Sequence, residues 1–385
     1  MASVYFHIPY CRKACTYCNF HFSTRLSGFE TMVEAMILDW NQQQLFIADN
    51  TVESVYFGGG TPSVLPYKLL EKLIDEIVTT KNVIADAEIT LEANPEDITQ
   101  QNLAEWRRIG INRISLGLQS LNDKELRWMN RAHDALQSRK SVESILSQGG
   151  FDLSVDLIYG SHLKSNENWR DELRWLQESG IHHLSCYALT VEEKTALFKL
   201  QHQSNNSLIC DDHGSQQFII LTEWAIENNW CHYEISNLSR TDSSKAKHNQ
   251  RYWQGHSYWG IGPGAHGFNG KKRRWNIANN ALYTKLISTE NSSLHYEEEE
   301  LTAINNFNEI LMTQLRLEQG VEINKLAAIV DDIVWKQWLM DSKKALKKWL
   351  FHGHISQTNS HLFLTGTGRL FADAITADLM LAVED

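Results

Sequence analysis

Short runs of β-branched and aromatic residues alternate with longer stretches of helical period through the first half of the chain. The clearest helical stretch covers residues 67–78, where the apolar side chains recur at intervals of three and four and should face a sheet: Leu69, Leu70, Leu73, Ile74, Ile77 and Val78. Strands that alternate with helices indicate a parallel α/β sheet. Six strands are predicted, at residues 4–6, 54–57, 88–92, 113–118, 153–158 and 183–187.

Two further helices have recognisable ends. Asp134 is a suitable N-cap for a helix over residues 135–148, and Gly149-Gly150 is a suitable stop. A helix at about 212–228 leads to a predicted strand near 231–235. In parallel α/β folds the βα loops gather at the carboxyl ends of the strands. Functional side chains are therefore expected at those ends.

The composition changes after residue 236. Residues 248–268 are dense in Tyr, Trp, Gly and His, and a basic run follows at Lys271-Lys-Arg-Arg274. Residues 290–300 end in four glutamates, which predicts a solvated connection or a helix start. We therefore expect an α/β core over residues 1–236, an aromatic and histidine-rich segment over 237–289 that completes it, and a C-terminal module over 290–385.

The C-terminal module has a pattern of its own. Helical character is found at residues 305–317, 323–330 and 332–350, and residues 354–364 resemble two short strands around a polar turn. Helices followed by a β-hairpin are typical of a winged-helix-like α+β module. Such modules bind DNA in many proteins, but the acidic residues Glu318, Asp331 and Asp332 favour an interaction role here.

Composition excludes several classes of protein. A chain of 385 residues with 42% hydrophobic and 22% charged residues can bury a large core, so it is neither disordered nor fibrous. Its 36 Lys+Arg against 47 Asp+Glu give a net charge of −11, which argues against a nucleic-acid partner or general affinity for anionic membranes. The N-terminus lacks a signal-peptide pattern, and no apolar run approaches the roughly 20 residues of a membrane span. A cytoplasmic location is predicted.

Three of the six cysteines fall within eight residues, directly after the first predicted strand. Cys11, Cys15 and Cys18 can converge on one metal centre, whereas a disulfide would leave one of them unpaired. A zinc site needs a fourth ligand, for which His21 is the only near candidate. Three thiolates on a [4Fe–4S] cluster leave one iron free for a small ligand.

The motifs around these cysteines resemble a known family. They are Tyr5-Phe-His-Ile-Pro-Tyr-Cys11 with its two further cysteines, Gly58-Gly-Gly-Thr-Pro62, Leu91-Glu-Ala-Asn-Pro95 and Ser115-Leu-Gly-Leu-Gln-Ser120. Together they resemble the radical SAM superfamily, and within it the group of HemN-type oxygen-independent coproporphyrinogen III oxidases and HemW-type heme chaperones. The resemblance runs from about Tyr5 to Gly267 and continues more weakly beyond. It implies a partial (β/α)6 TIM-type barrel, a [4Fe–4S] cluster on the three cysteines, and S-adenosylmethionine on the open iron.

The same resemblance assigns the S-adenosylmethionine contacts to Tyr5, Gly59, Gly60, Thr61, Glu92, Gln119, Arg131, Asp156 and Ala188. The glycine triplet after a strand exposes backbone N–H groups with no Cβ in the way of a ligand. Glu92 and Asp156 also fit a plainer role, as helix caps or partners of Arg131. One departure concerns the loop after Asp156, where Ser161-His162 replaces the Leu-Pro of relatives.

Two functions compete on this scaffold: radical decarboxylation of coproporphyrinogen III, and binding and delivery of heme. The oxidase pattern carries a further cysteine where this chain has Phe20, and oxidases have a longer segment ahead of the cluster than the ten residues found here. The segment from His248 to Trp253 matches the HNxxYW signature of HemW-type chaperones. All three features favour the carrier.

The HNxxYW segment has residues that suit heme. His248 can ligate iron axially, and Tyr252 and Trp253 offer flat apolar surface to a porphyrin. Rival ligands are His256, His266 and Cys231, and the basic run at Lys271 is either a grip for heme propionates or anionic lipid or a solvated turn. The resemblance further implies a heme-accepting apoprotein, respiratory or membrane-bound, a homodimer, and peripheral contact with the membrane.

Overall fold

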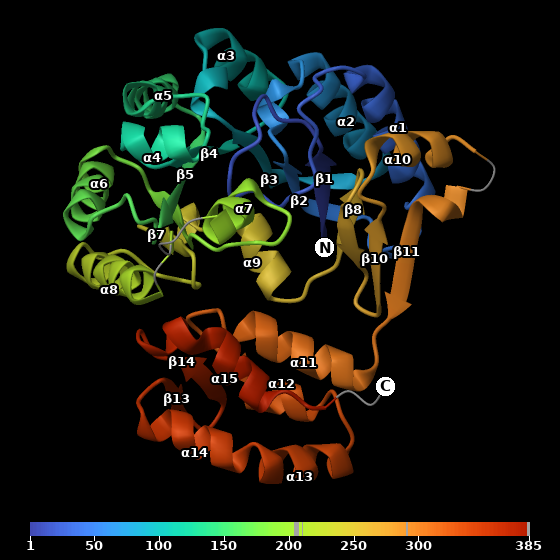
Figure 1. The fold of residues 1–385 in the computed structure, drawn as a ribbon. Helices are drawn as coiled ribbons and strands as arrows, with labels where there is room; N and C mark the ends of the chain where they lie inside the picture. The colour runs from blue at the N-terminus through green and yellow to red at the C-terminus, as the bar shows by residue number, and fades with distance from the viewer. Residues whose placement is uncertain (204–207, 210, 290–291, 383–385) are drawn as a thin grey trace.

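The computed structural model describes residues 1–203, 208–209, 211–289 and 292–382 of the chain. A large body holds an 11-stranded sheet with helices packed on it, and a smaller body of helices and short strands lies beyond one end (Figure 1). Across the described residues, no helix is both long and apolar enough to cross a bilayer.

The six predicted strands are confirmed. They are β1 (Ala2–Ile8), β2 (Thr51–Gly59), β3 (Asn82–Ala93), β4 (Arg113–Gln119), β5 (Asp152–Tyr159) and β6 (His183–Ala188). All six run parallel and lie side by side in chain order. The carboxyl ends of the strands, where functional side chains were expected, therefore form one edge of the sheet.

Helices connect these strands and cover the sheet. The longer ones are α1 (Phe29–Gln42), α2 (Tyr67–Thr80), α3 (Gln100–Arg108), α5 (Ala135–Gln148), α6 (Asn166–Glu178) and α8 (Asp211–Glu227). The shorter ones are η1 (Pro62–Val64), η2 (Pro95–Asp97), α4 (Asp123–Trp128) and α7 (Ala196–Gln203). In α2 the apolar stripe is buried as predicted except for Val78, which is 54% exposed because it lies at the edge of the stripe near the helix end. Asp134 caps α5, since its side chain accepts from the Gln137 amide.

The sheet continues past both ends of the parallel part. On one side β8 (Tyr258–Ile261) pairs parallel with β1, and β9 (His266–Phe268), β10 (Lys272–Asn276) and β11 (Tyr296–Glu300) follow antiparallel. On the other side β7 (Asn237–Ser239) pairs antiparallel with β6, so the sheet stays open. The linking elements are η3 (Asp242–Ser244), α9 (Lys247–Trp253), α10 (Asn280–Ile287) and η4 (Ser292–His295).

Two predictions for this half of the chain are wrong. The segment near 231–235 is no strand: Cys231 makes one isolated bridge to Ser239, which lies in β7. The glutamates are exposed as predicted, but they form neither a connection nor a helix start, because residues 296–300 are strand β11 and pair with the basic strand β10, with Arg274 opposite Glu298. Opposite charges on paired strands stabilise that register. Residues 290 and 291 of the predicted segment lie outside the described part.

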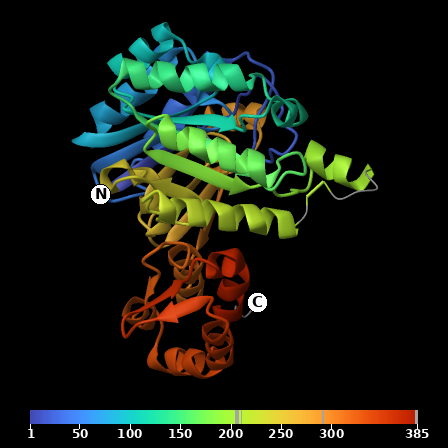
Figure 2. The same ribbon diagram turned by 90° about the vertical axis from the view of Figure 1, so that its left-hand side faces the viewer.

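The C-terminal body has its own hydrophobic core. Its elements are α11 (Ala303–Gln314), β12 (Val321–Glu322), α12 (Ile323–Ala327), α13 (Asp332–Asp341), α14 (Lys343–Phe351), β13 (Ile355–Gln357), β14 (His361–Leu364), η5 (Gly368–Phe371) and α15 (Ala372–Leu379). The core includes Phe307, Leu311, Trp338, Trp349 and Ile375. The helix predicted over 332–350 is two helices that meet at Ser342, whose hydroxyl donates to the Trp338 carbonyl at 2.6 Å. Figure 2 shows this body below the edge of the large sheet.

Candidate functional site

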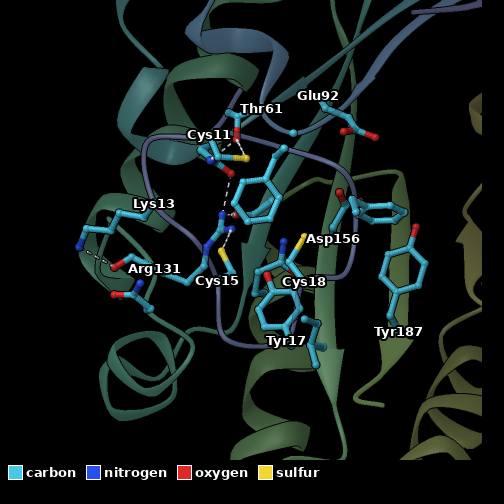
Figure 3. Close-up of a pocket in the computed structure, with 18 of the residues that line it drawn as sticks. Cys11, Lys13, Cys15, Tyr17, Cys18, Thr61, Glu92, Arg131, Asp156 and Tyr187 are labelled. Atoms are coloured by element: carbon cyan, nitrogen blue, oxygen red, sulfur yellow. Dashed lines mark hydrogen bonds between the residues drawn. The ribbon is translucent and has the colours of Figure 1, made fainter. Parts of the chain in front are cut away.

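A cavity of about 430 Å³ opens at the carboxyl ends of the parallel strands, and we call it the cysteine cavity (Figure 3). Of the residues expected to hold a cluster or S-adenosylmethionine, all but Tyr5 line it: Cys11, Cys15, Cys18, Gly59, Gly60, Thr61, Glu92, Gln119, Arg131, Asp156 and Ala188. They come from five strand ends, from the loop after β1 and, for Arg131, from the segment between α4 and α5. The topology thus brings together residues that are far apart in sequence.

The three cysteines are free thiols on the loop after β1. The Thr61 hydroxyl donates to Cys11 Sγ at 3.4 Å, and Arg131 Nη1 donates to Cys15 Sγ at the same distance. Burial raises the pKa of Cys11 to about 12 and also raises that of Cys18. Donors already aimed at sulfur favour a bound thiolate, and a metal would deprotonate these thiols.

The arrangement suits an iron–sulfur cluster better than zinc. His21, the only near fourth zinc ligand, has its Nε2 2.7 Å from Asn280 Oδ1 and lines a different cavity. Within residues 1–203, 208–209, 211–289 and 292–382, no three His, Cys, Asp or Glu side chains meet closely enough to hold a single ion. Three unpaired thiols around one open cavity, with the Arg131 guanidinium beside them to offset negative charge, fit the donor set of a [4Fe–4S] cluster.

Two partly buried carboxylates face the cysteines across the cavity. Glu92 accepts from Tyr56 Oη at 2.8 Å and from the Gly59 amide at 3.2 Å, while Asp156 accepts from the Ser115 hydroxyl at 3.1 Å. Burial raises the pKa of Glu92 to about 7 and that of Asp156 to about 6. Carboxylates that have raised pKa values and lie in a cleft are typical of a functional site.

The plainer roles proposed for Glu92 and Asp156 are not found in the described structure. Arg131 makes no ion pair with either carboxylate there. It donates instead to Asn94 Oδ1 at 2.6 Å and to the Gly117 carbonyl at 2.7 Å. Both carboxylates therefore remain available to a ligand in the cavity.

The glycines after β2 have a packing role that the sequence did not reveal. A Cβ on Gly59 would lie 2.7 Å from the His7 ring, and one on Gly60 would lie 2.6 Å from the Tyr10 carbonyl oxygen. Gly59 also has φ +107°, which side chains rarely adopt. These glycines are thus required for β1 and β2 to approach each other, and not only for a ligand's approach.

A second cavity, of about 870 Å³, adjoins the first, and we call it the aromatic cavity. His248, Tyr252 and Trp253 line it together with Tyr5, His7, His256 and His266. Cys231 does not line it and lies against Glu318 at 3.3 Å. The structure thus brings the HNxxYW residues and two of the three rival ligands to one cavity.

His248 is held from three directions. Its Nδ1 lies 3.0 Å from Ser54 Oγ, its ring centroid lies 5.0 Å from that of Tyr56, and its amide donates to Glu88 Oε1 at 2.9 Å. Burial lowers the pKa of His248 to about 3, so its imidazole is neutral. Its Nε2 has no hydrogen-bond partner among the described residues.

Most of the basic run at 271–274 is a strand rather than a turn. Lys272 pairs with Glu298 at 2.8 Å, and Arg273 pairs with Glu309 at the same distance. Arg274 lies 3.2 Å from the centroid of the Tyr296 ring. Of the four residues, Arg273 alone lines the aromatic cavity.

Sequence reasoning used Phe20 to separate the two functions but did not predict that the two cavities share lining residues. Asn19, Phe20 and Tyr187 line both. Two of them follow Cys18 directly and the third lies one residue before the end of β6, so proximity to the cysteines and to a strand end were the available signals. The shared wall makes the cavities neighbours, although His248 is far from the cysteines in sequence.

Comparison with known proteins identifies relatives along the whole chain. Residues 5–186 match the model of the Radical SAM superfamily. The chain is 30% identical to the heme chaperone HemW of Mycobacterium tuberculosis, over 98% of this chain and 94% of that protein. It is 29% identical to the heme chaperone HemW of Synechocystis, over 100% and 97%. It is also 33% identical to the mitochondrial radical S-adenosyl methionine domain-containing protein 1 of Danio rerio, over 69% and 60%.

Among solved structures, coproporphyrinogen III oxidase HemN from Escherichia coli superimposes with a TM-score of 0.83. The two chains are 19% identical, and the match covers 98% of this chain and 90% of the other. At that identity the likeness concerns the fold alone. The predicted α/β partial barrel of the radical SAM kind is therefore confirmed, with an open sheet.

Proposed function

This chain belongs to the HemW family of the radical SAM superfamily, and on that premise we propose that it is a heme chaperone that transfers heme to an acceptor protein. The aromatic cavity carries the proposal. It gathers a neutral histidine, several aromatic rings and two arginines, Arg251 and Arg273, in a space of about 870 Å³. A porphyrin needs an axial ligand, apolar faces and cationic partners for its propionates.

The hydrogen bonds around His248 support it as the axial ligand. The Ser54 hydroxyl donates to Ser3 Oγ at 2.7 Å, so its oxygen is free to accept from Nδ1–H of His248. That bond leaves the lone pair on Nε2, the tautomer that a metal requires. Burial keeps the pKa near 3, so protons do not compete for the lone pair at neutral pH.

The cysteine cavity would hold the resident cofactors. Cys11, Cys15 and Cys18 would ligate a [4Fe–4S] cluster. S-adenosylmethionine would bind the iron of that cluster that lacks a protein ligand, in contact with Glu92, Gln119 and Asp156. That pair of cofactors supplies one-electron and radical chemistry when bound. The chain's own residues position the ligand: Glu92 orients it with a carboxylate that Tyr56 and the Gly59 amide hold in place.

A second function, coproporphyrinogen III decarboxylation, is supported by the likeness to HemN in fold alone. Phe20 argues against it. It takes the place of the further cysteine of oxidases, is 66% exposed and lies in the wall between the two cavities. An apolar ring suits contact with a porphyrin face.

The proposal extends to the setting of the protein. We place it in the cytoplasm, as a homodimer in peripheral contact with the membrane, with a respiratory or membrane-bound apoprotein as acceptor. The division of the chain at residues 236 and 289 also belongs to the proposal.

The test is anaerobic reconstitution of the full chain with iron and sulfide, followed by heme titration and incubation with apo-acceptor. The expected result is one heme per chain, its transfer to the acceptor, and no decarboxylated porphyrinogen when coproporphyrinogen and S-adenosylmethionine are supplied. Decarboxylation without heme binding would overturn the assignment in favour of the oxidase.

A further inference from the structure

A fully buried charged cluster lies behind the cysteine cavity, and nothing so far gives it a role. Lys164 and Glu125 are 0% exposed and Glu172 is 5% exposed. Lys164 Nζ lies 3.4 Å from Glu125 and pairs closely with Glu172. Burying three charges costs free energy unless the geometry repays it in hydrogen bonds.

The carboxylates of the cluster accept hydrogen bonds from the two residues that follow Gln119. The Ser120 hydroxyl lies 2.6 Å from Glu125 Oε2 and 2.8 Å from Glu172 Oε1, and the Leu121 amide donates to the same Glu172 oxygen at 2.7 Å. Two successive residues are therefore fixed to one carboxylate.

Gln119 itself has an unusual backbone. Its φ is +68°, in the left-handed region that glutamine rarely adopts, and the register of β4 shifts between Gly117 and Gln119. Its side-chain amide folds over Gly117, where a Cβ would lie 2.9 Å from Gln119 Nε2. Strained backbone persists where the surroundings over-determine it.

The loop that departs from the relatives' pattern supplies the other half of the cluster. Ser161 donates to Glu125 through a short hydrogen bond, and Lys164 follows three residues later. The Lys164 carbonyl accepts from Gln217 Nε2 at 2.8 Å, which ties this loop to α8. Ser161 thus makes a polar contact with the cluster that a leucine at this position could not make.

From these contacts we infer that Glu172, with Lys164 and Glu125, positions Gln119 in the cysteine cavity. The cluster holds Ser120 and Leu121 so that Gln119 keeps its positive φ and its amide faces the ligand. This inference rests on the proposed binding of S-adenosylmethionine by Gln119. Glu172 touches no ligand and acts through Gln119.

The test is a double-mutant cycle with Glu172→Gln and Gln119→Ala in the reconstituted holoprotein, read as S-adenosylmethionine affinity by equilibrium dialysis. Each single variant is expected to weaken binding about three- to tenfold, the value of one hydrogen bond to a polar ligand. The double variant should bind no more weakly than Gln119→Ala. Glu172→Gln is a mild change, because Lys164 keeps Glu125 as its partner.

Ser120→Ala is a second, milder variant that leaves all three charges in place. Its smaller loss should also vanish in the Gln119→Ala background. Asp39→Asn is the matched control, a fully buried carboxylate that accepts from Tyr283 and Asn276 and lines neither cavity. It should lower the melting temperature and leave S-adenosylmethionine affinity as in the wild type.

Four outcomes would overturn the inference, and they point to three different explanations. If Gln119→Ala weakens binding and Glu172→Gln does not, the positioning role fails and the ligand site stands. Additive losses in the double variant, or an equal loss from Asp39→Asn, would mean that the cluster acts through general stability. Wild-type affinity in Gln119→Ala would remove both the ligand contact and the role of the cluster.

Discussion

The cysteine cavity and the aromatic cavity share a wall but differ in how the chain builds them. The first is lined from successive ends of parallel strands, each followed by a loop on the same edge of the sheet. The second combines β1, the cysteine loop, α9 and the antiparallel strands β8–β10. Successive βα units therefore form the cysteine cavity, whereas the aromatic cavity forms where elements far apart in the sequence pack together.

The difference also appears in the electrostatics. Burial raises the pKa of Glu92 and of Cys11 in the cysteine cavity and lowers the pKa of His248 in the aromatic cavity. In both places burial favours the neutral form. A cationic or metal-centred ligand would reverse that preference for the acidic groups, whereas neutral His248 is already in the form that binds iron.

The largest expected effect separates the two cavities completely. Replacing Cys11, Cys15 and Cys18 by serine should reduce cluster iron to background after anaerobic reconstitution, because the described residues that line the cavity then include no thiol. The heme absorbance should persist, since His248 belongs to the other cavity. The measurement is iron and sulfide content per chain beside the Soret band.

Cys186→Ser is the control for that experiment, because Cys186 is buried in β6 and lines neither cavity. It should keep four irons per chain. A triple variant with the wild-type iron content would contradict the ligand assignment.

The converse variant is His248→Ala. Loss of the axial ligand should weaken heme binding about 100-fold, or about 2.7 kcal/mol, and shift the Soret band, while the iron–sulfur absorbance stays. Heme titration at a fixed cluster content measures both. Unchanged heme binding here, with loss in His256→Ala or His266→Ala, would assign the ligand to one of those residues.

The sequence could predict the cysteine cavity because its determinants are local. Each strand was recognisable from a short apolar run, and parallel order follows once helices separate the strands. Glu92 and Asp156 were therefore expected at the same edge of the sheet as Cys11, because the carboxyl ends of parallel strands lie together. What it could not predict was packing detail, such as the close approach of Gly59 to His7 or the positive φ of Gln119, since these depend on neighbouring strands.

For the aromatic cavity, the sequence predicted only the residues of the HNxxYW motif and their rival ligands. His248 to Trp253 stood out, but nothing local indicated that Tyr5 would line this cavity beside them. The glutamate run is exposed as predicted, but the strand that it forms was missed for the same reason. Its polar residues indicated solvent, and only the pairing of β11 with β10 gives them a role.

A smaller effect tests the electrostatics of the cysteine cavity. The pKa of Glu92 rises in the folded protein from its ordinary 4.5 to about 7, so the folded state binds this proton more tightly than the unfolded state. Protonation of Glu92 therefore contributes fully to the free energy of unfolding below pH 4.5, and this contribution is lost as the pH rises through about 7. Glu92→Gln should therefore stabilise the cofactor-free protein by about 2 kcal/mol at pH 8 and much less at pH 5.

Urea unfolding at the two pH values measures that difference. The same variant should bind S-adenosylmethionine more weakly. Glu92 would then be a residue that destabilises the cofactor-free protein but is needed to bind the ligand. An equal change in stability at both pH values would show that the carboxylate is not the source.

The smallest expected effect concerns the aromatic cavity and the tautomer of His248. Ser54→Ala removes the acceptor at 3.0 Å from Nδ1 while Tyr56 still packs on the ring, so the imidazole stays in place but loses its preference for a lone pair on Nε2. Heme affinity should fall about two- to fivefold, which corresponds to the roughly 0.5–1 kcal/mol of one neutral hydrogen bond. Ser115→Ala, which removes the matching hydroxyl beside Asp156, should leave heme affinity unchanged. Equal heme affinities in wild type and Ser54→Ala would mean that the ring is oriented by packing alone, and equal losses in both serine variants would mean that the two cavities are not independent.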